Sequence, residues 1–335
     1  MTNPVLVEVS RGPLVESRHR GAVAIVAADG GMVLQIGDAD EPVFPRSAVK
    51  GMQAIALIES GAADRFGLSA EEIALACASH SGEPRHIETA RSMLKKAGHD
   101  EGCLECGAHW PSRDWVSRNL VKSGVEASAI HNNCSGKHSG FICVACAMDT
   151  PSKGYAGAGH PVQQEVRGIL ESLTGAVHGE ENRGTDGCSI PTYAIPLKAL
   201  ALGFARFGTG AGVGAQRAKA AARIRAAVAS APFMVAGTGR ACTQFMEATG
   251  DRAFIKTGAE GVFCAAFPAL GFGVAIKCDD GAGRAAEAVM AGLLERFIAL
   301  NENAAGIVRQ FSQPQLKNWN GAKVGAIRLS PALRG

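Results

Sequence analysis

The sequence lacks any stretch long and apolar enough to cross a membrane, because no run reaches the roughly 18 apolar residues that a spanning helix needs. It also lacks a run or stripe of lysine and arginine, and its basic and acidic residues are interleaved at a net charge of +3. We therefore expect no membrane association and no nucleic-acid partner. The N-terminal segment MTNPVLVEVSRG has no charged region followed by an apolar one, so we expect no signal peptide and a cytoplasmic location.

Aromatic residues are scarce, at 5% of the 335 residues, whereas glycine is frequent, at 42 residues. Hydrophobic residues nevertheless make up 47% of the chain and are spread throughout it, which predicts a large core rather than low-complexity disorder. The ten cysteines need an explanation other than disulfides, because the cytosol keeps thiols reduced. Most are expected to be small buried side chains, and some to bind metal.

Residues rich in β-branched side chains gather near both ends of the chain. Residues 4–9 and 22–35 predict strands, with a hairpin turn at Asp29-Gly30-Gly31. Helical patterns run from about 46 to 245, and a long helix is expected at about 283–299. Strands return at 253–257, 261–266, 271–277 and 323–329. We predict a single α+β domain over 1–335, with an antiparallel sheet from about 1–45 and 250–335 and a helical region of about 46–249 inserted beside it.

Ser47 and Lys50 form the first candidate pair for chemistry, in the sequence Ser-Ala-Val-Lys. Positions three apart share one face of a helix, so the hydroxyl and the amine can meet. Serine is a poor nucleophile until a base takes its proton, and a lysine can do so when burial or positive neighbours lower its pKa from about 10.4. Serine–lysine hydrolases use the S-x-x-K pattern in this way. A helix-capping serine followed by a solvated lysine would give the same spacing.

The sequence Lys256-Thr257-Gly258 ends an apolar segment that predicts a strand. K-T-G is the strand motif that faces the active serine in penicillin-binding folds, although a strand ending in an ordinary turn would look the same. The order of the two motifs, S-x-x-K after the N-terminal strands and K-T-G on a C-terminal strand, is more specific than either motif alone. Ser79 adds a candidate second hydroxyl, because helix capping explains its neighbour Ser81 better than it explains Ser79.

Two polar loops carry cysteines, at 131–138 and 186–191. A thiolate needs a compensating charge, which zinc supplies, so Cys134 and Cys188 are candidate ligands of a site that keeps one position open. His138 is the third ligand that chemistry alone favours, because a lysine must lose its proton before it can coordinate. A competing four-cysteine site would use the pairs at 103/106 and 143/146, although the second pair lies in an apolar run that fits a buried helix better.

These stretches together resemble the type 3, rhizobial-type L-asparaginases, and the resemblance extends from about residue 44 to 258. It is carried, in order, by FPRSAVK, ASHSGE, NNCSGKHSG, DGCSIPTY and IKTG. The resemblance implies a fold like that of serine β-lactamases and penicillin-binding proteins, a homodimer, and hydrolysis of L-asparagine to aspartate and ammonia. It also implies two serine–lysine tandems, one of Ser47 with Lys50 and one of Ser79 with Lys256.

The resemblance further implies a zinc ion bound by Cys134, Lys137 and Cys188, with water completing the shell, in place of His138 as the third ligand. His138 and Asp186 then become candidates for contacts with the substrate or the metal ligands. Arg46 is a candidate for a bidentate grip on the substrate α-carboxylate, although a solvated surface arginine is an equal alternative.

The mechanism we expect begins with attack of Ser47 on the side-chain amide, which gives a β-aspartyl ester and releases ammonia before water hydrolyses the ester. Ser79 and Lys256 would relay protons. Related serine amidohydrolases, either a glutaminase or a penicillin-recognising enzyme, are the nearest alternatives, because one methylene in a pocket is worth only about 1–3 kcal/mol of selectivity. A protein that binds zinc without catalysis is the alternative from another class.

Overall fold

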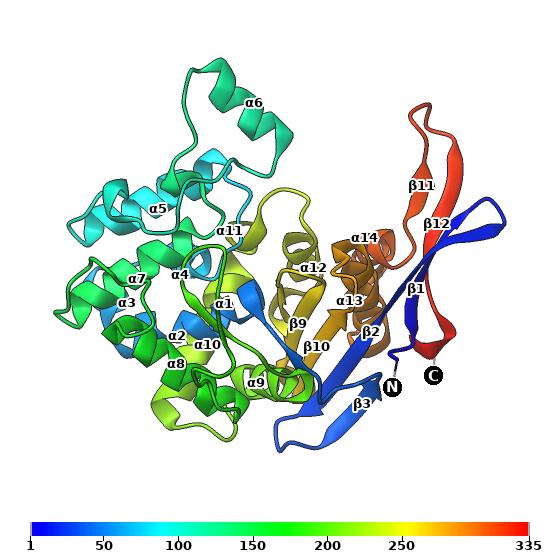
Figure 1. The fold of residues 1–335 in the computed structure, drawn as a ribbon, viewed down its shortest axis with the longest axis horizontal. Coiled ribbons are helices and arrows are strands. Elements are labelled where there is room, and N and C mark those ends of the chain that lie inside the picture. The colour runs from blue at the N-terminus through cyan, green and yellow to red at the C-terminus, as the bar shows by residue number, and fades with distance from the viewer. Residues whose placement is uncertain (1, 334–335) are drawn as a thin grey trace.

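Strands from both ends of the chain pair in one antiparallel sheet in the computed structural model, which describes residues 2–333 (Figure 1). The order along the sheet is β11-β12-β1-β2-β10-β9-β8, with β3 paired to β2. The strands are β1 (Val5–Arg11), β2 (Leu14–Ala27), β3 (Met32–Ile36), β8 (Phe254–Thr257), β9 (Val262–Phe267), β10 (Phe272–Cys278), β11 (Gln315–Lys317) and β12 (Lys323–Leu329). The predicted α+β architecture, with its sheet built from both termini, is confirmed.

The strand β2 joins two parts of the sheet. Its first half, from Leu14 to Arg20, pairs with β1, and its second half, from Gly21 to Ala27, pairs with β10. The first half is largely exposed and the second half is buried. For this reason the prediction found only the second half, since the first half alternates polar residues and has no apolar face. The hairpin turn predicted at residues 29–31 does connect β2 to β3.

Most of the chain between β3 and β8 is helical, and these helices make up the left-hand part of the molecule in Figure 1. They are α1 (Lys50–Gln53), α2 (Ile55–Glu59), α3 (Ala62–Arg65), α4 (Ala70–Ala76), α5 (Pro84–Lys96), α6 (Asp114–Lys122), α7 (Ser135–Ala147), α8 (Pro161–Thr174), α9 (Leu197–Thr209), α10 (Ala215–Ser230), α11 (Phe233–Ala236) and α12 (Ala241–Thr249). Two more helices, α13 (Gly283–Phe297) and α14 (Glu302–Ser312), lie between β10 and β11 in the chain. In the part of the chain that is described, no helix is long and apolar enough to span a bilayer.

Short elements interrupt the helical region. The 3-10 helices are η1 (Arg46–Val49), η2 (Glu101–Cys103), η3 (Ala129–His131), η4 (Gly250–Arg252), η5 (Pro268–Leu270) and η6 (Pro331–Leu333). Two small strand pairs, β4 (Pro42–Val43) with β7 (Ile195–Pro196) and β5 (Arg183–Thr185) with β6 (Pro191–Tyr193), were not predicted. The first pair holds the segment that leads into η1 against the start of α9.

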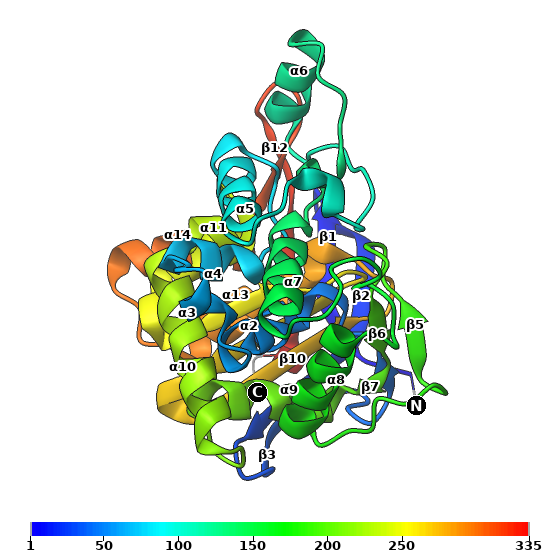
Figure 2. The same ribbon diagram turned by 90° about the vertical axis from the view of Figure 1, so that its left-hand side faces the viewer.

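The sheet is covered by helices on both faces at β10, whose residues from Gly273 to Ile276 are all buried. Neighbouring strand residues point to opposite faces, so burial of every one requires a cover on each side. The covers are α9, which packs on β2, β9 and β10, and α13, which packs on β1, β9, β10 and β12 (Figure 2). A Cβ on Gly273 would lie 2.0 Å from the carbonyl oxygen of Ala201 in α9, so only glycine permits this approach.

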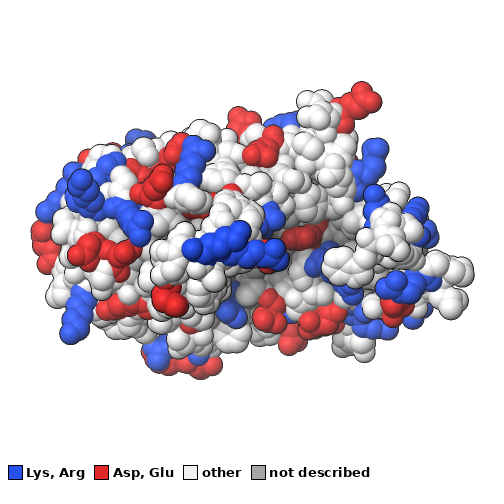
Figure 3. All heavy atoms as spheres, turned by 90° about the horizontal axis from the view of Figure 1, so that it is seen from above, with Lys and Arg blue, Asp and Glu red and all other residues white. Residues whose placement is uncertain are grey.

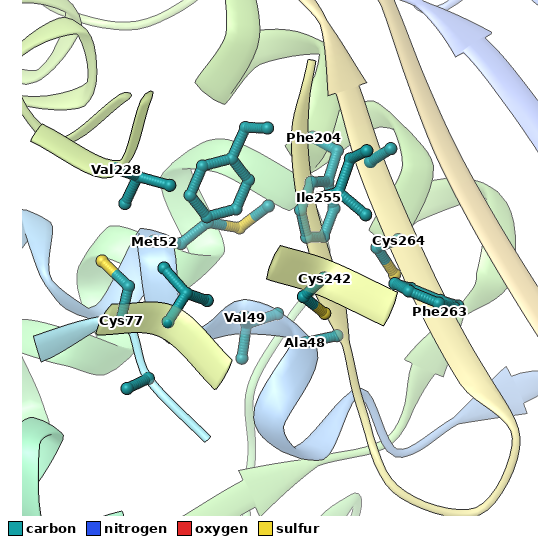
Figure 4. Packing of buried hydrophobic residues seen from close by; sticks show 14 of the residues in the cluster. Ala48, Val49, Met52, Cys77, Phe204, Val228, Cys242, Ile255, Phe263 and Cys264 are labelled. Atoms are coloured by element: carbon teal, nitrogen blue, oxygen red, sulfur yellow. The ribbon is translucent and has the colours of Figure 1, made fainter. Parts of the chain in front are cut away.

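The core beneath the candidate site is drawn in Figure 4. Ala48 and Val49 come from η1, Ile255 from β8 and Cys242 from α12, and all are buried in one hydrophobic cluster with Cys77. Ala48, Val49 and Ile255 are chain neighbours of predicted site residues, and Cys77 lies two residues before Ser79. Packing of the apolar members of each segment therefore fixes where the polar members stand.

Candidate active site

Two buried lysines meet at one serine. Lys50 Nζ donates a hydrogen bond to Ser79 Oγ at 3.0 Å, and Lys256 Nζ donates to the same oxygen at 2.9 Å. Lys50 and Lys256 are 1% and 0% exposed, and Ser79 is 6% exposed. Lys50 also donates to the Ala78 carbonyl, and Lys256 to the Thr257 carbonyl, so each amine is held in a defined place. Three of the four predicted tandem residues thus converge.

Burial gives Lys256 an unusual acidity. The pKa of Lys256 is lowered to about 7, mainly because burial disfavours the charged amine, and the positive charges of Lys50 and Arg240 add to this effect. A lysine of this kind is neutral in about half of the molecules near pH 7, so it can accept a proton as an ordinary lysine cannot.

Ser47 is placed at the start of this site without a partner for its hydroxyl. It is half-buried in η1, and its side chain makes no hydrogen bond with the part of the chain that the structure describes. The expected contact with Lys50, three residues later, is therefore not formed in this state. The preceding residue, Arg46, has a φ of 49°, a left-handed conformation that is strained for a non-glycine residue. Arg46 is the first residue of η1, and the helical pattern predicted from residue 46 onward is divided into the short elements η1, α1 and α2, with an interruption at Ala54.

The glycine of the K-T-G motif explains how β8 approaches this turn. A Cβ on Gly258 would lie 2.7 Å from the carbonyl oxygen of Pro45, which immediately precedes Arg46. A larger residue would push the strand end away from η1. The motif thus contributes Lys256 to the centre and brings Gly258 against the segment that carries Ser47.

Ser79 is held by backbone and side-chain contacts on both sides. Its N–H donates to the carbonyl of Val235, a residue of α11, at 2.9 Å. Next to it, His80 Nδ1 accepts from the Gly82 N–H at 3.1 Å, so the neutral ring carries its proton on Nε2, which lies 2.9 Å from Ser135 Oγ. Burial, followed by the neighbouring His86, holds the pKa of His80 well below its usual value, and His80 is therefore an uncharged positioning residue.

Cys134, Lys137 and Cys188 form a second cluster that adjoins the first. Lys137 Nζ donates to Cys188 Sγ at 2.9 Å, and Lys50 Nζ donates to Cys134 Sγ at 3.0 Å, which connects the two clusters. The two sulfurs lie close enough to share a proton. Hydrogen bonding between them lowers the pKa of Cys134 well below its usual value and raises that of Cys188. Burial alone would lower the pKa of Lys137, but the charges of Cys188 and Cys134 together raise it.

His138 is not the third member of this cluster, so the preference for it from chemistry alone is wrong. The described residues contain no group of three or more histidine, cysteine, aspartate and glutamate side chains arranged to hold a metal. Instead, Tyr155 Oη lies 2.7 Å from His138 Nδ1 and accepts a hydrogen bond from the Glu105 N–H. The Tyr155 contact holds the His138 ring away from the cysteines, and His138 Nε2 is buried without a partner among the described residues.

The alternative four-cysteine site is also wrong, because residues 2–333 hold no such metal cluster. Cys143 is instead a buried residue of α7, where its thiol faces the Met93 carbonyl. Cys146 Sγ lies 3.3 Å from His99 Nε2 and donates to the Ala97 carbonyl at 3.9 Å. The apolar run around these cysteines is a buried helix, as the simpler prediction stated.

Arg46 and Asp186 form an ion pair at 2.6 Å, in which Arg46 Nε donates to Asp186 Oδ1. The Asp186 carboxylate is mostly buried. Burial would raise its pKa, but Lys137 and Arg46 together lower it below the usual value. Arg46 is therefore not a solvated surface arginine. A cavity of about 460 Å³ opens beside it, and Phe44, Glu260 and Lys277 also line that cavity.

Sequence reasoning missed the loop of residues 237–240, Gly-Thr-Gly-Arg, which contacts the segment carrying Ser79. Glu83 Oε1 and Oε2 accept from the Thr238 N–H and Oγ1 at 2.8 and 2.7 Å, and Oε1 also accepts from Ser81 Oγ at 2.6 Å. Two glycines before a charged residue, next to an apolar segment, are a signal that could have marked this loop as functional.

Comparison with known proteins shows the family to which the chain belongs. Solved structures with a similar fold include a β-lactamase of Mycobacterium bovis, at 13% identity over 79% of this chain and 89% of that one, with a TM-score of 0.42. They also include Mglu, at 18% identity over 88% of this chain and 71% of that one, with a TM-score of 0.39. No curated protein matches. The sequence model of one family, described as L-asparaginase II, matches residues 7–329. The match confirms the predicted family: the chain belongs to the L-asparaginase II family.

Proposed function

We propose that this member of an amidohydrolase family hydrolyses L-asparagine to L-aspartate and ammonia at the cluster of Ser47, Lys50, Ser79 and Lys256. The single observation that carries the proposal is Ser79 Oγ between two buried lysine amines, at 3.0 and 2.9 Å. Amide hydrolysis needs a nucleophile without its proton and an amine that leaves with an extra one. A hydroxyl that bridges two amines can move a proton between them, which serves both needs.

Ser47 is the nucleophile in this proposal, and Ser79 is the relay. Ser79 is buried, and its hydroxyl accepts hydrogen bonds from the amines of Lys50 and Lys256. It is therefore poorly placed to reach a substrate but well placed to pass a proton from Lys50 to Lys256. Ser47 is half-buried with a free hydroxyl, and it follows the strained residue Arg46. A sharp, strained turn that presents a serine is a device that other hydrolases use for their nucleophile. We expect the missing hydrogen bond between Ser47 Oγ and Lys50 Nζ to form when substrate binds.

The proton balance follows from these positions. Ser47 Oγ attacks the side-chain carbonyl while its proton passes to Lys50 and, through Ser79, to a neutral Lys256. The C–N bond then breaks, the departing nitrogen takes this proton, and ammonia leaves with an ester on Ser47. Water attacks the ester with the same lysines as acceptors, which releases aspartate and restores the serine.

Zinc is proposed for the cluster of Cys134, Lys137 and Cys188, and the chemistry of these donors fits it. Two thiols share a proton, and the buried Lys137 amine has no hydrogen-bond acceptor but a sulfur among the described residues. A cation that displaces these protons would find two thiolates and one nitrogen, with a fourth position open. When bound, zinc would supply a positive charge to which polar groups of the substrate can be anchored, because two thiolates cancel its formal charge and weaken its action as a Lewis acid.

Substrate contacts are proposed for Arg46 and Asp186 beside the cavity, where the Asp186 carboxylate can accept from the α-ammonium group of an amino acid while Arg46 holds that carboxylate in place. His138, which is buried behind the cysteine cluster, is proposed to keep α7 in position rather than to move protons. A homodimer and a cytoplasmic location stay predictions from the resemblance and the sequence.

Release of ammonia by the purified protein, measured side by side with L-asparagine and L-glutamine, tests this function. We expect turnover of L-asparagine with the higher kcat/KM, and Ser47→Ala should abolish it while leaving the circular dichroism spectrum unchanged. Faster turnover of L-glutamine would make the enzyme a glutaminase, and hydrolysis of nitrocefin would make it a penicillin-recognising enzyme. Stoichiometric zinc without turnover of any amide would favour the non-catalytic alternative.

A further inference from the structure

The loop of residues 237–240 is tied to the segment of the catalytic Ser79 at its first end. Val235, two residues before the loop, accepts the Ser79 N–H at 2.9 Å. Gly237 packs so closely that a Cβ there would lie 2.1 Å from Ser81 Oγ and 2.4 Å from Glu83 Oε1. Thr238 is bound by Glu83 through both its N–H and its hydroxyl. Four contacts at one short loop leave it little freedom.

The same loop is tied to the strand of Lys256 at its other end. Arg240 is the residue before α12, and Cys242 in the first turn of that helix accepts the Thr257 N–H on its sulfur at 3.2 Å. Thr257 directly follows Lys256. The loop therefore spans the gap between the two segments that meet at the serine–lysine centre. Its outer residues Thr238 and Gly239 are exposed, so the loop reaches the surface beside these two segments.

Arg240 is the charged residue of this loop and has no partner. It is half-buried, and its guanidinium makes no hydrogen bond or ion pair with any of residues 2–333. Burial raises the pKa of Glu287 on α13, and the positive charge of Arg240 partly offsets this rise. No ion pair joins the two side chains. Because no described residue occupies its five donors, they remain free to bind an acceptor that a ligand supplies.

A second guanidinium strengthens the positive charge at this point. Arg113, at the start of α6, has its Nε buried without a partner among the described residues, and its Nη2 would lie 3.1 Å from a Cβ on Gly239. Figure 3 shows the face that carries α6, which is hollowed near its centre and bears basic and acidic side chains around the hollow. Arg113 and Arg240 thus bring two guanidinium groups, neither ion-paired with a described carboxylate, to the neighbourhood of Gly239, and this positive charge favours an anion.

We propose that Arg240 binds the α-carboxylate of the amino-acid substrate, and thereby selects amides that carry a carboxylate. This inference rests on the proposed function. Arg46 is the less suitable candidate for the same role, because Asp186 already occupies its Nε and neutralises its charge. Arg240 offers a planar fork of donors that fits a carboxylate in a bidentate manner.

Paired substrates with and without the α-carboxylate test the inference. L-Asparagine carries the carboxylate, and 3-aminopropanamide is the same molecule without it. Arg240→Gln should lower kcat/KM for L-asparagine by about 10- to 100-fold, mainly through KM, because a charge-assisted bidentate contact is lost. Both assays are run at pH 9, where Lys256 is largely neutral with or without the charge of Arg240, and there the same variant should leave kcat/KM for 3-aminopropanamide within about twofold of the unsubstituted enzyme. Arg223→Gln, which removes an arginine paired with Asp64 on the surface, is the matched control and should change neither substrate.

Product inhibition gives the same comparison without turnover. L-Aspartate carries the α-carboxylate and β-alanine lacks it, so Arg240→Gln should weaken inhibition by L-aspartate alone. Equal losses of kcat/KM or of inhibition for both members of each pair would overturn the proposal and make Arg240 a structural residue. An unchanged kcat/KM and unchanged inhibition for every compound would also overturn it. Loss of the discrimination in Arg46→Gln but not in Arg240→Gln would assign the role to Arg46. Failure of the unsubstituted enzyme to release ammonia from L-asparagine would instead overturn the proposed function.

Discussion

The activity of this enzyme should rise with pH through a midpoint near 7, because Lys256 must be neutral to accept a proton. The pKa of Lys256 is about 7, compared with 10.5 for a lysine in water. About half of the molecules then carry a neutral Lys256 at pH 7 and about one-tenth at pH 6, whereas an unperturbed lysine would be neutral in about one molecule in 3000 at pH 7. Below the midpoint, kcat/KM should fall about tenfold per pH unit.

Initial rates of ammonia release from L-asparagine between pH 5.5 and 9 would measure this profile, with circular dichroism at each pH to confirm folding. The buried histidines do not interfere, because burial lowers the pKa values of His80 and His86 and their titration falls below that of Lys256. Arg240→Gln should move the midpoint to higher pH, since the charge of Arg240 contributes to the low pKa. A profile that is flat from pH 6 to 8, or a midpoint near 10, would refute the assignment of Lys256 as the proton acceptor.

The same lysine makes stability depend on pH with a defined sign. Its pKa is lower in the folded state than in the unfolded state, so between pH 7 and 10.5 the unfolded chain binds the additional proton. Burial of Lys256 therefore destabilises the fold most below pH 7, and the penalty, of the order of 5 kcal/mol, is relieved as the pH rises to about 10.5. Lys256→Met removes this buried amine. The increase in the free energy of unfolding between pH 7 and about 10.5, measured with urea, should therefore be smaller in this variant than in the unsubstituted protein.

Three further substitutions give separate tests. Ser79→Ala removes the acceptor shared by both lysines and should lower kcat by about 100-fold or more, with KM little changed, in steady-state assays; activity near that of the unsubstituted enzyme would exclude a relay at Ser79. Cys134→Ser should reduce bound zinc, measured by elemental analysis after dialysis, and raise KM more than it lowers kcat; the reverse pattern would give zinc a direct catalytic part. Gly237→Ala places a Cβ 2.1 Å from Ser81 Oγ at a φ of +100° and should cost about 1–3 kcal/mol in urea unfolding. Gly250→Ala, at a φ of +61° with nothing within 4 Å, is its control, and equal costs would show that the crowding at Gly237 is unimportant.

The architecture could be predicted from local patterns, because β-branched segments at both ends and helical periodicity between them are properties of short windows of sequence. The failures occur where the pattern is weak or interrupted. The exposed half of β2 has polar residues on both faces, and the helical pattern that starts at residue 46 is divided into the short elements η1, α1 and α2. Neither feature changes composition enough to be read from the chain alone.

The site was predicted less completely, because its contacts join distant segments. The spacing of Ser47 and Lys50 suggested a hydrogen bond between them, but Lys50 instead bonds Ser79, 29 residues away. The lysine beside Cys188 came from family resemblance, since chemistry alone favoured His138. That preference failed because Tyr155 occupies His138 Nδ1, a contact that no local pattern reveals.

Trapping the covalent intermediate would test the central claim most directly. Rapid acid quench of the enzyme with saturating L-asparagine, followed by proteolysis and mass spectrometry, identifies the residue that carries the aspartyl ester. We predict the ester on Ser47, with accumulation increased in Ser79→Ala if deacylation needs the relay. An ester on Ser79, or turnover of L-asparagine without an ester on either serine, would contradict the account.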